Sequence, residues 1–97
     1  MPVAGLVEGR DGPQVVAGQI DRLVVGAESV AVVDYKSNRR PPEDAAGVPE
    51  VYIRQMAAYR ALLSEIYPGR RIDCYLLWTG GPRLMQLSPA QLADHAP

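Results

Sequence analysis

The chain has 97 residues, of which 47% are hydrophobic and 22% are charged, and its formal net charge is −1. This length and composition predict one folded domain over residues 1–97 and argue against a disordered chain. The chain has no excess of basic residues, which is common in modules that bind DNA electrostatically. A role in nucleic-acid binding must therefore rest on local chemistry.

Cysteine content and hydropathy indicate the kind of cellular compartment in which the protein is expected. The single cysteine, Cys74, excludes an internal disulfide and is typical of a reducing compartment, where we expect it to be a small buried hydrophobe on a strand. No apolar run approaches 18 residues, and no charged segment followed by an apolar one opens the chain. We therefore expect an intracellular protein without a membrane span or a signal peptide.

Turn residues divide the chain into segments of different hydrophobic period. Valine-rich segments with alternating polarity are typical of strands, and the period changes to that of a helix after a proline-rich loop at residues 37–49. We expect strands at residues 2–9, 14–25, 30–36, 72–79 and 83–87, a helix at 50–66, and a short helix opened by Ser88 and Pro89. This order, β-β-β-α-β-β-α, is typical of an α/β or α+β domain with a helix packed on a sheet, and we expect an α/β fold with a mixed sheet.

The second and third expected strands carry acidic residues beside apolar ones. In the later strand, alternation puts two valines on a face that ends in Asp34 and Lys36. The earlier strand is expected to present one face made of Ala17, Gln19, Asp21, Leu23 and Val25.

A symmetric turn centred on Ala27 and Glu28 would place Asp21 opposite Asp34. Directly opposed Cβ atoms lie about 4.5–5.5 Å apart, so two carboxylates there repel unless a cation lies between them. A divalent metal with oxygen ligands fits that position, and Lys36 adds a second positive charge. A register shifted by one residue would separate the acids. The alternative is an ordinary ion pair between Asp34 and Lys36, with Asp21 in solvent.

The expected helix contains a polar residue on its apolar face. Projected at helical spacing, Gln55 falls inside the stripe expected to face the core, one turn before Tyr59. A buried amide costs about 1–3 kcal/mol unless it is hydrogen-bonded. Gln55 could bond a backbone carbonyl at the edge of the core, or it could form a polar pair with Tyr59 that faces a ligand. The stripe comprises Tyr52, Met56, Tyr59, Leu62, Leu63 and Ile66.

Three motifs, taken in order, resemble the RecB-type branch of the PD-(D/E)xK nucleases. The family pattern is G-x-hydrophobic-D-R, then D-(Y/F)-K, then a helix with Q-x-x-x-Y. The sequence around the second motif most resembles that of the C-terminal nuclease domain of AddA-type helicase–nuclease subunits, which process double-strand breaks in bacteria. The resemblance covers roughly residues 14–66. The motifs are Gly18-Gln19-Ile20-Asp21-Arg22, Val33-Asp34-Tyr35-Lys36 and Gln55-Met56-Ala57-Ala58-Tyr59.

The resemblance implies a restriction-endonuclease-like fold and a Mg²⁺-dependent deoxyribonuclease, acting as an exonuclease, for which Mn²⁺ would serve as a surrogate ion. By position, Asp21, Asp34 and the main-chain carbonyl of Tyr35 match metal ligands, and Lys36 matches the catalytic lysine. The substrate-binding candidates are Gln55 and Tyr59 from the third motif, together with Arg39 and Arg40, which follow the D-x-K strand on a proline-rich loop.

The chain departs from this family in one respect. Family members carry an earlier helix that adds a histidine or acidic ligand, and we expect no such helix here; the only histidine, His95, is expected at a solvated helix end. We therefore interpret the chain as the truncated metal-binding core of a larger helicase–nuclease, with weak or no activity alone.

The expected partners are DNA, the remainder of the helicase–nuclease polypeptide and its partner subunit, in the bacterial cytoplasm, and a homodimer of the fragment is left open. A non-catalytic DNA-binding or partner-docking module on the same fold is the main alternative. A small structural domain, in which D-x-K is only an ion pair, is the second.

Overall fold

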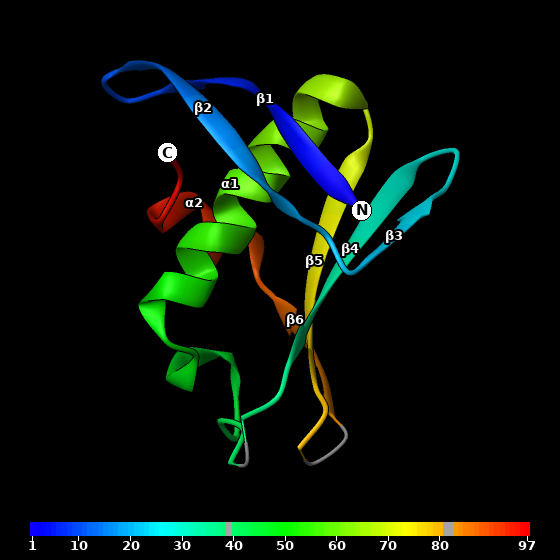
Figure 1. Ribbon diagram of the computed structural model, residues 1–97, viewed down its shortest axis with the longest axis vertical. Coiled ribbons are helices and arrows are strands. Elements are labelled where there is room, and N and C mark those ends of the chain that lie inside the picture. The colour runs from blue at the N-terminus through cyan, green and yellow to red at the C-terminus, as the bar shows by residue number, and fades with distance from the viewer. Residues whose placement is uncertain (39, 81–82) are drawn as a thin grey trace.

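The computed structural model describes residues 1–38, 40–80 and 83–97. Four strands precede a long helix, and two strands and a short helix follow it (Figure 1). None of the described helices is long and apolar enough to cross a lipid bilayer. The elements are β1 (Pro2–Gly9), β2 (Gly12–Gln19), β3 (Arg22–Val25), β4 (Ser29–Lys36), a 3₁₀ turn (Ala45–Gly47), α1 (Glu50–Ile66), β5 (Arg71–Trp78), β6 (Arg83–Leu87) and α2 (Pro89–Asp94).

The strands form two separate sheets around α1. Strands β1 and β2 form an antiparallel hairpin, whereas β3, β4, β5 and β6 lie side by side in that order in a mixed sheet. Only the β4–β5 pair is parallel, because α1 provides the crossover between them. Helix α1 contacts β5 on one side and the β1–β2 hairpin on another, and the hairpin crosses over the helix in Figure 1. The mixed α/β class expected from the sequence is confirmed.

The prediction of one strand at residues 14–25 is wrong, because this segment forms two strands in different sheets. In β2 the inward positions are Val16 and Gly18, and Ile20 continues that phase with only 1% of its surface exposed. The inward residue of β3 is Leu23, which is out of step with this alternation by one residue. One continuous strand cannot keep both patterns, so the chain must break between Ile20 and Leu23. The expected face through Ala17 and Gln19 is therefore exposed.

The core lies between α1 and one face of the four-stranded sheet. Alternate residues of β4 and β5 supply the sheet side, including Val32 and Trp78, and neither of these two is exposed at all. Cys74 is buried among them, as expected, and burial raises the pKa of its thiol to about 12. Of the helix stripe predicted to be core, Ile66 is instead 51% exposed, because α1 ends there and the chain turns toward β5.

Two glycines let the hairpin approach α1 closely. A Cβ added to Gly5 would lie 2.5 Å from Cδ1 of Leu62, and one added to Gly18 would overlap the hydroxyl of Tyr59. Gly18 is the glycine of the first motif, and its missing side chain leaves room for the Tyr59 ring. The end of β2 is thereby held against the third motif on α1.

Candidate active site

The β3–β4 hairpin brings Asp21 and Asp34 together. Its register pairs Val25 with Val30 and Arg22 with Val33, as the symmetric turn predicts, and Asp21 directly precedes this ladder. An Oδ2 atom of Asp21 accepts a hydrogen bond of 2.8 Å from the backbone N–H of Tyr35. Asp21 is exposed, whereas Asp34 on the inward face of β4 is only 6% exposed. One carboxylate thus faces solvent and the other faces the core.

The two carboxyl groups interact with each other, and their environments move their pKa values apart. The interaction with the Asp34 carboxyl group, followed by the hydrogen bond from the N–H of Tyr35, lowers the pKa of Asp21. Burial, followed by the interaction with Asp21, raises the pKa of Asp34, and Lys36 only partly opposes this. Asp34 is therefore the more readily protonated of the two groups.

Lys36 is held from three sides at the end of β4. Its Nζ lies 2.5 Å from Oδ2 of Asp34, donates a hydrogen bond of 3.1 Å to Oε1 of Gln55, and lies 4.1 Å from the ring centroid of Tyr52. Its side chain is only 13% exposed. These contacts fix an ammonium group beside the carboxylate pair.

The third motif connects this site to the hairpin. The Nε2 of Gln55 donates to the Tyr59 hydroxyl at 3.3 Å, and that hydroxyl accepts from the backbone N–H of Gln19 at 3.2 Å. The prediction that Gln55 is buried in the core stripe is wrong, because its side chain lies at the solvent edge of α1. Of the two interpretations left open, the Gln55–Tyr59 pair is present, and it extends to Lys36.

The role of Tyr52 was not found from the sequence, which placed it in the core. Its ring lies under Lys36 and packs at 6.1 Å from the ring of Trp78, and its hydroxyl donates to Oδ1 of Asn38 at 3.4 Å. The available signal was its spacing, because Tyr52 lies one helical turn before Gln55 and so shares its face.

Other predicted residues lie outside this cluster of contacts. Arg39 falls outside the described residues, and Arg40 is exposed on the loop after β4. His95 is not at a solvated helix end as expected: it is half-buried at the end of α2, with Nδ1 2.9 Å from the carbonyl oxygen of Gln91 and Nε2 3.8 Å from Oε1 of Glu50.

The residues present fit a divalent cation with oxygen ligands. Oδ2 of Asp34 is buried and, within the described residues, has no hydrogen-bond partner, although its charge is paired with that of Lys36. Among those same residues no three His, Cys, Asp or Glu side chains cluster, so the candidate set is two carboxylates and a main-chain carbonyl. Mg²⁺ suits such a set because it keeps several of its waters.

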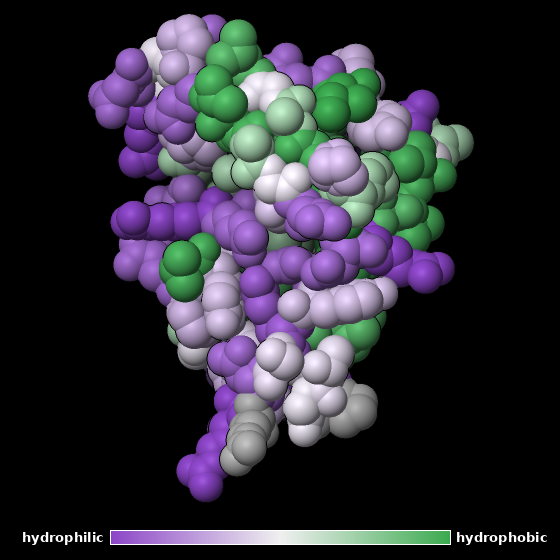
Figure 2. Space-filling view, in the orientation of Figure 1, coloured by the Kyte–Doolittle hydropathy of each residue, from purple (hydrophilic) through white to green (hydrophobic). Residues whose placement is uncertain are grey.

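Comparison of the sequence with known proteins shows the family to which the chain belongs. A family model described as the PD-(D/E)XK nuclease superfamily matches residues 3–95. The chain belongs to this superfamily. Membership confirms the resemblance carried by the three motifs and the restriction-endonuclease-like class of the fold. Figure 2 shows hydrophilic side chains gathered in a band across the middle of the face on which this nuclease domain presents α1 and the end of β2.

Two relatives of this nuclease domain are helicase–nuclease subunits from Lactococcus lactis subsp. cremoris. The exonuclease/helicase subunit RexA of strain MG1363 and an ATP-dependent helicase/nuclease subunit of strain SK11 are each 36% identical to it over 70 residues. The match covers 71% of this chain and 6% of either relative, so the chain is similar to a small part of each. No solved structure matches the chain.

Replacing Asp34 by asparagine is expected to stabilise the metal-free protein at neutral pH. The pKa of Asp34 is raised in the folded protein, so protonation of Asp34 favours folding. Asp34 therefore contributes stability below about pH 4, the ordinary pKa of aspartate in an unfolded chain. This contribution is lost as the pH rises through the raised pKa of the folded protein. Asparagine has nearly the same shape as aspartate but cannot carry the buried charge. Thermal unfolding in a chelator should therefore show Asp34→Asn unfolding at a higher temperature than the wild type, with a gap that narrows toward about pH 4.

The matched control is Asp11→Asn, which removes an exposed acid from the β1–β2 turn and should show no pH-dependent gain. A lower unfolding temperature for Asp34→Asn at neutral pH would mean that the ion pair with Lys36 outweighs the burial of Asp34.

Proposed function

We propose that this chain is the metal-binding core of a Mg²⁺-dependent deoxyribonuclease that hydrolyses phosphodiester bonds as an exonuclease. The observation that carries the proposal is the buried Asp34 carboxylate, held against Asp21 and Lys36 at the end of β4. A stabilising ion pair needs one acid and one base. A second acid held by the N–H of Tyr35 adds repulsion, and a divalent cation would relieve it.

In this proposal Asp21, Asp34 and the main-chain carbonyl of Tyr35 hold the metal. When bound, the ion supplies Lewis-acid polarisation of the phosphate and lowers the pKa of water. The ammonium group of Lys36 orients the attacking water and offsets negative charge that develops on the phosphate. Gln55 positions that ammonium through the bond of 3.1 Å.

The proposed substrate contacts come from α1 beside Lys36 and from the loop that follows β4. Gln55 is exposed, so its amide can contact substrate as well as Lys36, whereas the buried Tyr59 supports Gln55 through its hydroxyl. Arg39 and Arg40 are proposed phosphate contacts, since they follow Lys36 closely in the chain and Arg40 is exposed.

The wider setting is also a proposal. The similarity to helicase–nuclease subunits supports a role as part of an ATP-dependent helicase–nuclease that processes DNA ends in double-strand break repair, with a partner subunit, in the bacterial cytoplasm. A homodimer of this chain is a further option.

Metal binding separates this proposal from a non-catalytic docking module, which has no need of the acidic pair. Saturating Mn²⁺ should raise the free energy of unfolding, by about 2.7 kcal/mol at 100 times the dissociation constant. Asp21→Asn keeps an acceptor for the N–H of Tyr35 but removes a charged ligand, so this gain should be lost. Asp11→Asn, which removes an acid from a distant turn, should keep it. An equal gain in wild type and Asp21→Asn would contradict the assigned ligands.

Cleavage tests the assignment of Lys36. We expect the purified chain to degrade DNA weakly or not at all, and any Mn²⁺-dependent cleavage to fall by about 100-fold or more in Lys36→Gln, because charge stabilisation at the phosphate is lost. The Mn²⁺-induced stabilisation should remain in this variant. Robust Mg²⁺-dependent degradation by the wild type would contradict the expected weak activity, and unchanged cleavage by Lys36→Gln would contradict the catalytic role of Lys36.

A further inference from the structure

The ring of Tyr52 forms one side of the space that holds the Lys36 ammonium group. Nζ of Lys36 lies over this ring, 4.1 Å from its centroid, and the lysine side chain is only 13% exposed. Tyr52 belongs to the first turn of α1, whereas Lys36 ends β4, so the contact joins the helix to the sheet. The electron-rich face of an aromatic ring attracts a cation, and more strongly where water is partly excluded. The contact therefore depends on the charge of Lys36 as well as on packing.

Neighbouring residues fix the Tyr52 ring in its place. Trp78, which is fully buried, packs against it with the ring centroids 6.1 Å apart and the ring planes tilted by 51°. Trp78 is also the partner of Lys36 in the β4–β5 ladder, so Tyr52 contacts two side chains that are neighbours on the inward face of the sheet. The Tyr52 hydroxyl donates to Oδ1 of Asn38 at 3.4 Å. The ring thus offers Lys36 a surface whose position is set by the core.

The three groups that hold Lys36 differ in charge. Asp34 is an acid, whereas Oε1 of Gln55 and the Tyr52 ring are neutral. If Asp34 binds a divalent cation as proposed, its negative charge is shared between that ion and the ammonium group, and the two cations repel each other. The ion pair of Lys36 with Asp34 then weakens. The contacts with Gln55 and Tyr52 do not depend on the charge of Asp34, so they matter most when metal is bound.

We propose that Tyr52 is a positioning residue of this site, whose ring keeps the Lys36 ammonium beside Gln55 when a metal ion takes up the charge of Asp34. The inference rests on the proposed function for the metal-bound state. The hold of the ring on Lys36 in the metal-free protein does not depend on it. The alternative is that Tyr52 only packs against Trp78, and that Asp34 and Gln55 alone position the lysine.

Lysine-selective NMR tests the proposal, because Lys36 is the only lysine in the sequence and gives a single side-chain spin system. In protein labelled with ¹³C-lysine, the ε-methylene protons of Lys36 should resonate upfield of those of an exposed lysine, because the Tyr52 ring faces Nζ. Relaxation of the same methylene gives its order parameter, which reports whether the side chain is fixed. We expect a fixed side chain both in a chelator and with saturating Mg²⁺.

Two variants of Tyr52 separate the ring from its hydroxyl. Tyr52→Phe keeps the ring and loses only the hydrogen bond to Asn38, so the shift and the order parameter of Lys36 should stay as in the wild type. Tyr52→Leu keeps an apolar side chain beside Trp78 but removes the ring. With Mg²⁺ its Lys36 order parameter should fall below about 0.6, as in flexible groups. The fall should be smaller in a chelator, where Asp34 still pairs fully with the ammonium group.

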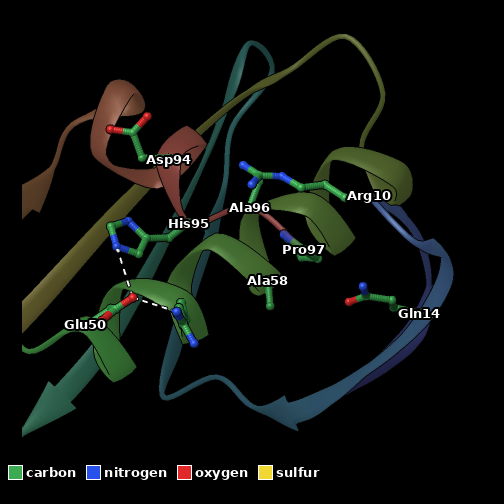
Figure 3. Close-up of a pocket in the computed structure, with 9 residues that line it drawn as sticks. Arg10, Gln14, Glu50, Ala58, Asp94, His95, Ala96 and Pro97 are labelled. Atoms are coloured by element: carbon green, nitrogen blue, oxygen red, sulfur yellow. Dashed lines mark hydrogen bonds and ion pairs between the residues drawn. The ribbon is translucent and has the colours of Figure 1, made fainter.

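Glu50→Gln controls for general loosening at the start of α1. Glu50 lies two residues before Tyr52, which puts the two side chains about 200° apart around the helix. Its carboxylate points toward His95 in Figure 3 and pairs with Arg54 at 2.6 Å. The variant weakens these pairs without touching the Tyr52 ring, so the order parameter of Lys36 should not change.

Tyr67→Leu is the control for the substitution itself. Tyr67 follows the far end of α1, and its ring lies 5.3 Å from the guanidinium carbon of Arg70, so the variant removes a similar contact at a distance from the site. The signals of Lys36 should stay as in the wild type. Circular dichroism of each variant checks that α1 remains folded.

Three results would overturn the inference: a Lys36 order parameter in Tyr52→Leu that equals the wild-type value with Mg²⁺, a fall in Tyr52→Phe as large as that in Tyr52→Leu, or an equal fall in Glu50→Gln. The second would assign the hold to the hydroxyl, and the third to the helix start. The Mn²⁺-induced stabilisation distinguishes this inference from the proposed function. Normal stabilisation with an unchanged Tyr52→Leu removes the inference alone. No stabilisation of the wild type, with Lys36 mobile in Tyr52→Leu in a chelator, removes the metal site and leaves the hold of the ring.

Discussion

The site depends on one constraint, which is that the β3–β4 register brings a second carboxylate against the buried Asp34. Burial and the proximity of Asp21 both disfavour the ionised form of Asp34, and Lys36 compensates only in part. A fold that needed stability alone would place an apolar residue at this inward position of β4, next in line after Val30 and Val32. The carboxylate pair therefore reduces the stability of the metal-free fold, and in the proposed metal site a bound cation would restore the balance.

The rest of the molecule holds this pair and its lysine in place. Helix α1 bridges the two sheets, and its Gln55 and Tyr59 connect Lys36 on one sheet to the backbone of Gln19 on the other. The absent side chain of Gly18 allows that contact, because any Cβ there would meet the Tyr59 ring. The first and third motifs thus form one structural unit, and the second motif lies against it through Lys36.

The sequence was sufficient to predict the fold class, the hairpin register and the neighbouring acids, because a short turn between two valine-rich strands leaves few alternative pairings. It did not reveal the break at Ile20, because the segment from Val15 to Val25 is rich in valine and isoleucine and resembles one strand, and only the change of inward phase marks two sheets. Helical projection likewise gave Gln55 a buried position. Gln55 lies at the edge of the apolar stripe, so its burial depends on where the β1–β2 hairpin packs. The sequence of α1 alone does not determine that position.

Paramagnetic NMR tests the central claim most directly. In a Mn²⁺ titration of the labelled chain, we predict that amide signals broaden first at Asp21, Asp34 and Tyr35, and that Asp34→Ala abolishes this broadening at the same metal concentration. Broadening that is spread over the exposed acids, or that persists unchanged in Asp34→Ala, would contradict a metal site built on the carboxylate pair.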